Sequence, residues 1–533
     1  MQFTRQELCT RILEGQHLII YNRKVLRIPA SWLDAHPGGS LVLLHFVGRD
    51  ATAEVDAYHN DQILPLVNKY SIGFLAEPGP WNPLLPPIAA GWARKDGEWV
   101  NEAATWNDSN QVFLVAKDSL ALQKTAPTIE ALTPSPSQLS LQIQEQHSAA
   151  YKALHKRVID AGLYRTPYLT GYGPEFFRYI SLGLISAYAF RHNWLLTSAF
   201  ALGLLWHQLM FFAHDLGHMG VTGSWTVDRL ISIVIADFIG GLSIGWWVDN
   251  HNVHHLVTNH PSHDPDIQHL PFFAISPKFF SNLYSSYYRR ILPLDCGARF
   301  FIPLQHKLFF VVMAFARFNL YRRSYDWMVS QISQKRRARG GRWAVALEFA
   351  GVFVFWCWFG GIVLRGCGSW QKALAYILVS HVTTSPLHVQ IVLSHFGMST
   401  EDLGPLESFP GRQLRTTMDV ICPDQWAFIH GGLHLQVTHH LFPRLPRHNL
   451  SKASLMAKEF AKEEGLTYVE FGFISANQEV MGVLREVAGL VSSLGQQVKL
   501  VAEVASVEAK EAVDKKIAQQ YAFSRMDNAS QAI

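Results

Sequence analysis

The sequence predicts a mainly α-helical membrane protein with a small α+β unit at its N-terminus. Three observations support this fold class. At 533 residues the chain is too long for one ordinary domain. Strongly apolar stretches at 176–213 and 343–394 are long enough for pairs of membrane-spanning helices, whereas residues 1–170 are typical of a soluble protein. Clusters of histidine lie beside the apolar stretches.

Residues 1–78 are expected to form the α+β unit. Ser31–Gly39 is rich in turn-forming residues, and helical patterns follow at 40–47 and 50–58. Tyr70–Leu75 is typical of a short strand that closes the unit.

A connecting segment is expected at 79–164. Residues 76–110 are rich in Pro, Gly and Trp and indicate irregular structure, and Thr125–Ser137 indicates a flexible linker. A polar helix is expected from about Leu139 to Ala161.

Four membrane-spanning helices are expected in the third part of the chain, residues 165–465. The short joints between the helices predict two helical hairpins. The four spans are Phe176–Phe190 (extended back to Tyr172), Trp194–Ala213, 343–364 and 370–394.

Two further apolar runs are expected not to cross the membrane. A crossing at Ile231–Trp247 would place His218 and His251 on opposite faces, so this run is interpreted as interfacial or re-entrant. Phe300–Phe318 is interrupted by polar residues and indicates a surface-lying or buried helix.

Basic residues crowd the loop before the third span. They are Arg322, Arg323, Lys335, Arg336, Arg337, Arg339 and Arg342. Because basic loops face the cytosol, the histidine clusters and both termini are expected on the cytosolic side. The last part, residues 466–533, is a tail whose pattern at 470–520 predicts an amphipathic helix. This helix could lie on the membrane, lie on the unit that carries the histidine clusters, or be solvated.

The bulk composition excludes several classes of function. The net charge of +4 gives no indication of nucleic-acid binding, and the N-terminus has no apolar core of a signal peptide. Five scattered cysteines without a CxxC motif are neither a disulfide framework nor a thiolate metal site.

The histidine clusters predict a metal site. They are His214-Asp-Leu-Gly-His218, His251-Asn-Val-His254-His255 and Gln436-Val-Thr-His439-His440. Spacings of three and four residues place side chains on one helix face, so three such faces can bring seven imidazoles together. Imidazole ligands suit iron, copper, zinc and nickel.

The N-terminal unit resembles cytochrome b5. The resemblance covers about residues 5–78 and rests on His36-Pro-Gly-Gly, on His59 and on Ser71-Ile-Gly near the end of the unit. It implies that His36 and His59 are the axial ligands of a haem b that transfers single electrons. His45 is a rival for the second ligand, but it follows His36 too closely to reach the opposite haem face.

Residues 165–460 resemble the membrane fatty-acyl and sphingolipid desaturases. All three histidine boxes match, and Gln436 at the start of the third box is typical of the "front-end" subgroup. The resemblance implies two non-haem irons, with O2 as co-substrate. The absence of thiolates disfavours a structural zinc, and removal of hydrogen from a methylene needs an oxygen-derived oxidant, which non-haem iron supplies.

The resemblance also implies which residues are catalytic. The expected iron ligands are His214, His218, His251, His254, His255, His439, His440 and, as the best further candidate, His395. Gln436 is expected to coordinate weakly or to hold a ligand or water, and His388 is a weaker alternative to His395. Asp215, Asp249, Asp264 and Asp266 are candidates for orienting the imidazoles, or alternatively surface or capping residues. The remaining histidines near the boxes are expected to be supporting or structural: His260, His263, His269, His430, His434 and His448.

The chain is most similar in appearance to fungal delta-8 sphingolipid desaturases, through Asn250–Asn259, Pro386–Gln390, the linker and the tail. This implies an endoplasmic-reticulum enzyme that desaturates the long-chain base of a ceramide or a free sphingoid base. Electrons would come from NADH or NADPH through a separate cytochrome b5 reductase, because the chain shows no nucleotide-binding motif. The alternatives are a front-end fatty acyl desaturase of the delta-5 or delta-6 type, a lipid hydroxylase and a non-catalytic protein.

Overall fold

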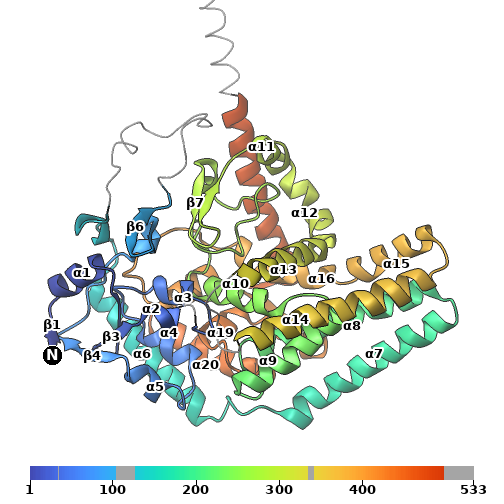
Figure 1. The fold of residues 1–533 in the computed structure, drawn as a ribbon, viewed down its shortest axis with the longest axis horizontal. Coiled ribbons are helices and arrows are strands. Elements are labelled where there is room, and N and C mark those ends of the chain that lie inside the picture. Colours follow the sequence, from blue (N-terminus) through green and yellow to red (C-terminus); the bar gives the residue numbers. More distant parts are fainter. Residues whose placement is uncertain (34, 104–125, 334–340, 497–533) are drawn as a thin grey trace, which may run out of the picture.

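The computed structural model describes residues 1–33, 35–103, 126–333 and 341–496. Figure 1 shows an elongated molecule with the N-terminal unit at one end and a bundle of long helices at the other. The remaining helices lie between the two ends. The long helices are α7 (Gly173–Arg191), α8 (Leu195–Gly217), α14 (Gly341–Phe355), which continues as the π-helix η9 (Trp356–Leu364), and α15 (Trp370–Val382).

The N-terminal unit is a four-stranded sheet covered by short helices. The strands are β1 (Gln2–Phe3), β2 (His17–Tyr21), β3 (Lys24–Ile28) and β4 (Ser71–Leu75), in the order β1-β4-β3-β2. The helices are α1 (Arg5–Leu13), α2 (Ala30–Leu33), α3 (Leu41–Leu44), α4 (Thr52–Tyr58) and α5 (Leu64–Asn68). The two expected helices and the closing strand are confirmed. β4 pairs in parallel with β1. This closure requires a glycine, since a Cβ at Gly73 would lie 2.2 Å from the carbonyl oxygen of Met1.

The connecting segment is more ordered than the sequence predicted. An antiparallel hairpin of β5 (Trp92–Lys95) and β6 (Glu98–Asn101) lies where irregular structure was expected. The prediction of a flexible linker at Thr125–Ser137 is also wrong for residues 126–137, which the structure describes. Leu132 is fully buried against the core of the N-terminal unit, and its carbonyl accepts a hydrogen bond from the backbone N–H of Leu85.

A long helix then leads to the second half of the chain, as predicted. This helix, α6 (Leu141–Asp160), packs against α17 (Phe409–Thr416) and α20 (Leu450–Glu463). Its buried face carries Tyr151, whose hydroxyl donates a hydrogen bond to the carbonyl of Leu441. The connecting segment is therefore fixed beside the third histidine box.

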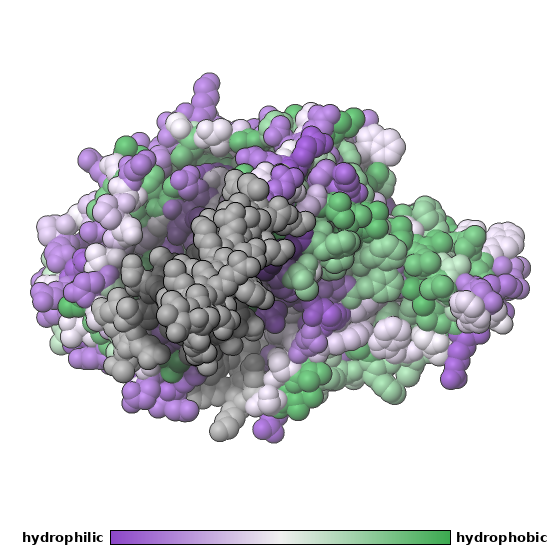
Figure 2. Space-filling model, turned by 90° about the horizontal axis from the view of Figure 1, so that it is seen from above, coloured by the Kyte–Doolittle hydropathy of each residue, from purple (hydrophilic) through white to green (hydrophobic). Residues whose placement is uncertain are grey.

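Three helices are long and apolar enough to cross a membrane, or up to five if two bent pairs each count as one span. The three are Leu195–Gly217, Arg342–Leu364 and Trp370–Phe396. α7, which belongs to the first expected span, is not among them. α7 nevertheless lies along α8, and it exposes Phe177, Ile180 and Leu184. Figure 2 shows apolar side chains gathered at the end of the molecule that these helices form.

The two bent pairs correspond to the two apolar runs that were expected not to cross. α9 (Trp225–Ile233) continues as the π-helix η6 (Val234–Ile239), and α10 (Ile244–Leu256) follows after a bend of 115°. In the second pair, α11 (Cys296–Phe301) and α12 (Gln305–Ala314) meet α13 (Ala316–Ser333) at 72°. The first bend turns α10 back, so that its histidines face the end of α8.

The C-terminal part closes the region between the two ends. It contains the helices α16 (Ser385–Phe396), α18 (Ala427–His430) and α19 (Gln436–Leu441) and the parallel strands β9 (Asp419–Ile421) and β10 (Glu470–Gly472). Earlier in the chain, β7 (Leu283–Ser285) and β8 (Arg290–Leu292) form a hairpin. Residues 473–496 are helical and bury Val480 and Leu484 in one core with α12 and α16. The described part of the tail therefore lies on the catalytic unit, and its expected continuation to residue 520 lies outside the described residues.

Candidate dinuclear metal site

Helix ends from four parts of the chain meet at one point between the N-terminal unit and the long helices. His214 lies in the last turn of α8, and His218 caps that helix. The second box lies along α10, the third along α19, and His395 lies in the last turn of α16. The rings of His218 and His251 are 5.2 Å apart, so the first and second boxes lie on the same side of the apolar region.

Two groups of imidazoles are arranged as metal-ligand sets. Within each group the potential ligand atoms lie within 4.8 Å of one another. The first group is His214, His218, His251 and His439; the second is His254, His395 and His440. Seven of the eight histidines expected as ligands, His395 among them, thus fall into two neighbouring sets.

The eighth expected ligand, His255, lies between the two groups. Its Nε2 is 3.0 Å from Nε2 of His251 and 3.2 Å from Nε2 of His439, and its ring stacks on His440. Ring nitrogens this close, with bonds of about 2 Å to one metal, subtend roughly a right angle at that metal. Either group could therefore include His255.

The unpaired nitrogens of the cluster provide a test of whether metal ions fit. Buried nitrogens without a hydrogen-bond partner among the described residues include Nε2 of His214, His218 and His440. Leaving such atoms unsatisfied is costly, and a metal ion would satisfy them. Burial and the surrounding imidazoles also lower the pKa of His439 and His440 far below the usual range. These two rings are neutral, which is the form that binds a metal.

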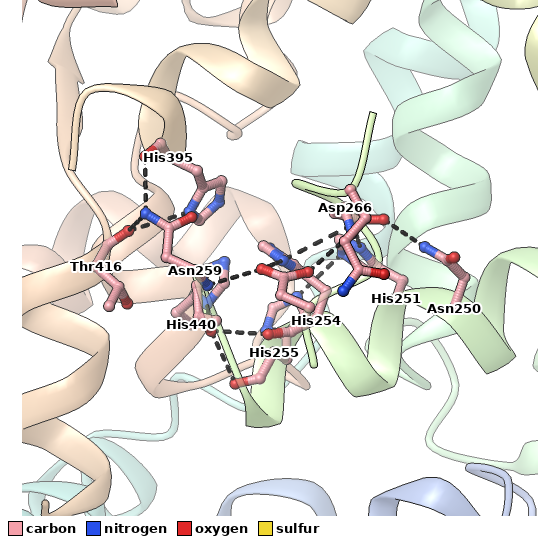
Figure 3. Close-up of polar contacts among 12 residues, drawn as sticks. Asn250, His251, His254, His255, Asn259, Asp266, His395, Thr416 and His440 are labelled. Carbon is pink, nitrogen blue, oxygen red and sulfur yellow. Dashed lines mark hydrogen bonds and ion pairs between the residues drawn. The ribbon is translucent and has the colours of Figure 1, made fainter. Parts of the chain in front are cut away.

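The other ring nitrogen of several cluster histidines is held by a neighbour, as Figure 3 shows for part of the site. Nδ1 of His254 is 2.9 Å from Asp264, and Nδ1 of His251 is 3.2 Å from Asp266. Nδ1 of His440 is 2.9 Å from the side-chain oxygen of Gln413. Such contacts fix the ring orientation and raise the basicity of the ligating nitrogen.

Two neighbours of the cluster were not found by sequence reasoning. Gln413 lies on α17 and Asn259 follows α10, and neither belongs to a histidine box. The Asn259 amide donates to the carbonyl of His395 at 2.8 Å, and its backbone N–H donates to Asp264 at 2.7 Å. Asn259 therefore joins the second box to His395.

The other two candidate aspartates have different neighbours. Asp215 accepts hydrogen bonds from Tyr172 at 2.6 Å and from Arg447 at 3.0 Å, while Nδ1 of His214 is 3.6 Å away. Asp249 faces the N-terminal unit, where a Cβ on Gly39 would come within 2.6 Å of its carboxylate. Asp215 is thus part of a buried network with α7, and Asp249 belongs to the contact between domains.

A cavity of about 670 Å³ opens beside both ligand groups. His214, His251, His254, His395 and Gln436 line it where it meets the cluster. Its other lining residues are largely apolar, among them Phe273, Met313, Leu387, Ile391 and Val392. The buried side-chain oxygen of Gln436 has no partner among the described residues, so it is free to bind a metal, a water or a substrate.

The remaining histidines near the boxes lie outside the ligand groups. His388 lines the cavity, with Nδ1 3.1 Å from the carbonyl of Met313. Of the six expected as supporting residues, four contact a polar side chain: His260 contacts Asp402, His263 contacts Ser286, His448 contacts Glu175 and His430 contacts Gln390. The ring of His434 lies beside that of His430, and His269 lines the cavity.

His36 and His59 face each other in the N-terminal unit. Their ring centroids are 6.2 Å apart, a spacing that leaves room for one iron with bonds of about 2 Å to each ring. Nδ1 of His59 is 3.0 Å from the carbonyl of Val55, and Nδ1 of His36 is 3.3 Å from that of Gly39. These contacts leave Nε2 of both rings for a metal. The rival ligand, His45, instead contacts Ser286 of the second half at 3.2 Å.

Comparison with known proteins identifies two families, one for each of two regions of the chain. Residues 192–472 match the family model "Fatty acid desaturase", and residues 4–76 match "Cytochrome b5-like Heme/Steroid binding domain". A "Delta 8-(E)-sphingolipid desaturase" of Emericella nidulans is 39% identical, covering 92% of this chain and 95% of its own. A protein of that name from Kluyveromyces lactis is 40% identical over 96% of both chains. "Delta(8)-fatty-acid desaturase 1" of Arabidopsis thaliana is 29% identical, covering 91% of this chain and 93% of its own.

Proposed function

The chain belongs to the fatty acid desaturase family and carries a cytochrome b5-like domain, and on this premise we propose that it is a delta-8 sphingolipid desaturase. It would introduce a double bond of (E) geometry into the long-chain base of a ceramide or a free sphingoid base. The fungal relatives that match nearly the whole chain carry this activity in their names. The observation that carries the proposal is the apolar cavity whose wall includes residues of both imidazole groups.

The residues of each site indicate which group they would hold. The two imidazole groups would hold two non-haem irons, with His255 shared or assigned to either, and His36 and His59 would hold haem b. When bound, the irons supply oxidation of an unactivated C–H bond by O2, and the haem supplies single electrons. The reductase that reduces the haem would be a separate NADH- or NADPH-dependent cytochrome b5 reductase.

The cavity would select the position of the double bond. A methylene chain offers no polar group to recognise, so the reacting carbons must be set by their distance from the head group. Phe273, Met313 and Ile391 would hold the chain away from water beside the cluster. Gln436 lies in the same wall, at the edge of the ligand set, where it would hold a water or contact the reacting segment.

We further propose that the protein resides in the endoplasmic-reticulum membrane with four crossings and with the histidine cluster, the haem domain and both described ends on the cytosolic side. The exposed apolar face of α7 beside α8 supports a crossing by α7 in addition to the three long apolar helices. Arg322 and Arg323 on α13 line the same cavity as the histidines of the cluster. Of the other basic residues of this loop, Arg342 lies at the start of α14, and those at 335–339 lie outside the described residues.

Expression in a cell that makes sphingolipids without this double bond tests the proposal. Mass spectrometry of long-chain bases should show a new product lighter by two hydrogens, with the double bond after C8. The variant His439→Ala, expressed to the same level, should make none. Gain of one oxygen would instead identify a hydroxylase, and unsaturation confined to fatty acids would identify an acyl desaturase, as the name of the Arabidopsis relative suggests for that protein.

A further inference from the structure

Tyr58 connects the two metal-binding parts of the chain. It is the last residue of α4 and directly precedes His59. Its ring meets the ring of His255 edge to face, with centroids 6.4 Å apart. One aromatic side chain therefore adjoins a proposed haem ligand along the backbone and a histidine of the dinuclear cluster through space.

The packing around Tyr58 holds this contact in place. Val42 and Phe46 of the N-terminal unit share a buried cluster with Val253 and Leu256 of α10, and Tyr58 packs against the same cluster. A hydrogen bond of 3.0 Å runs from Nε of Arg444, just after the third box, to the carbonyl of Ala57. Both contacts flank Tyr58, and they hold the end of α4 against the part of the chain that carries the histidine boxes.

His255 is also the histidine that touches both ligand groups. Its Nε2 lies 3.2 Å from that of His439 in the first group, and its ring stacks on His440 of the second with centroids 4.1 Å apart. An electron that reaches His255 is therefore within one contact of either metal position.

We propose that Tyr58 is the bridge through which electrons tunnel from the haem domain to the dinuclear site. The inference rests on the proposed function. In each transfer a ferrous haem iron becomes ferric and one ferric non-haem iron becomes ferrous, with no bond made or broken and no proton moved. Tunnelling is faster through packed and bonded atoms than across a gap, and Tyr58 provides a bonded link to His59 through the backbone and a ring contact with His255.

The bridge needs the ring of Tyr58 but not its hydroxyl. The buried hydroxyl has no hydrogen-bond partner among the described residues. Because no described residue accepts a hydrogen bond from it, the phenol is not set up to pass its proton directly to a base while it is oxidised and reduced in turn. Phenylalanine at position 58 should therefore support electron transfer as tyrosine does, whereas a non-aromatic side chain should not.

Tyr70 provides a matched control within the same domain. It packs against the same buried cluster and stacks on Trp32 at 6.3 Å, and Trp32 in turn meets His36. Tyr70 thus lies on the haem side, and no ring contact joins it to a box histidine in the described part of the chain. Tyr58→Leu and Tyr70→Leu remove rings of equal size from one cluster, but only the first removes the bridge.

The experiment uses the full chain loaded with haem and iron. The haem is reduced, the protein is mixed with O2 and ceramide, and the loss of the ferrous haem absorbance is followed by stopped flow. Tyr58→Leu should slow haem oxidation by about ten-fold or more, while Tyr58→Phe and Tyr70→Leu should stay within about two-fold of the parent. The haem spectrum, the iron content and the rate of haem reduction by the reductase should be unchanged in all variants.

A small reductant that reaches the non-haem irons directly distinguishes a bridge from a structural role. It should restore double-bond formation to Tyr58→Leu, because only the internal supply of electrons is impaired. Haem oxidation by Tyr58→Leu at the parent rate, or no recovery with the small reductant, would overturn the inference. Failure of the parent to desaturate any sphingolipid would instead refute the proposed function.

Discussion

The carboxylate of Glu348 on α14 accepts a hydrogen bond from the hydroxyl of Ser243 at 2.6 Å, and this pair fixes the start of the helix that carries the second histidine box. The same carboxylate oxygen lies 3.2 Å from the backbone N–H of Gly245. The Ser243 hydroxyl in turn accepts the N–H of Trp246 at 3.0 Å, as an N-cap does. A carboxylate from another helix thus satisfies donors at the N-terminus of α10. The partial positive charge at this end of the helix also favours a negative group there.

Glu348→Ala should therefore lower the stability of the protein, by about 1–3 kcal/mol, because buried donors at Ser243 and Gly245 lose their acceptor. Glu348→Gln retains an acceptor oxygen and should cost less. Thermal unfolding in detergent measures both effects, with the exposed pair Arg322–Asp326 as a control site, where Asp326→Ala should change little. Equal unfolding temperatures for Glu348→Ala and the parent would contradict the capping role.

Asp264 should control metal affinity rather than folding alone. Its carboxylate lies 2.9 Å from Nδ1 of His254 and also accepts the backbone N–H of Asn259. Loss of a carboxylate behind a ligating histidine typically weakens metal binding by about 10–100-fold. Asp264→Asn should show this loss when non-haem iron is measured after dialysis against a graded chelator, while the haem content stays constant.

A second carboxylate on the same segment of chain provides a comparison. Asp266 lies 3.2 Å from Nδ1 of His251 and 3.9 Å from Nδ1 of His254, and the three residues also form a candidate metal-binding group. Asp266→Asn should therefore also weaken iron retention. An Asp264→Asn protein that keeps iron as tightly as the parent would show that its carboxylate serves the backbone of Asn259 only.

The stability of the region around the third histidine box should fall as the pH rises towards neutrality because of Asp419. This carboxylate accepts the N–H of Val437 at 2.8 Å beside the third box and also bonds to Tyr468. Burial raises its pKa to about 7, whereas an unfolded aspartate ionises near pH 4. The folded chain therefore holds the proton more tightly than the unfolded chain, and stability decreases between these two pH values.

The size of this effect is at most about 4 kcal/mol, since each pKa unit corresponds to about 1.4 kcal/mol. Asp419→Asn cannot ionise, so its unfolding temperature should depend less on pH between 4 and 7 than that of the parent. Thermal unfolding at a series of pH values measures the difference. Parallel pH profiles for the two proteins would exclude Asp419 as the cause.

The histidine cluster was predictable because its signal is local. Spacings of three and four residues place His251, His254 and His255 on one side of α10, and the box at the end of α8 works in the same way. The partners that orient the rings were not predictable. Gln413 reaches His440, and Asn259 reaches His395, across long stretches of chain, so no pattern in the neighbouring sequence records these contacts.

The fold shows the same division between local and distant signals. The short strand and the helices of the N-terminal unit follow from local patterns. The β5–β6 hairpin was missed although Asp96-Gly97, both with positive φ, is a typical hairpin turn. The contact between Tyr58 and His255 depends on how two domains dock, which neither domain's sequence pattern contains.

Removal of one proposed haem ligand should abolish haem binding of the normal type without affecting the proposed iron site. His36→Ala leaves His59 as the only imidazole at the haem position, so the protein should lose its bis-histidine haem spectrum. The candidate dinuclear ligands lie outside the N-terminal unit and are untouched, so the content of non-haem iron should equal that of the parent. Double-bond formation should stop in cells that lack any other haem electron donor, and coexpression of a separate cytochrome b5 is the natural control. Full activity of His36→Ala without such a donor would show that electrons reach the irons by a route that bypasses the fused domain.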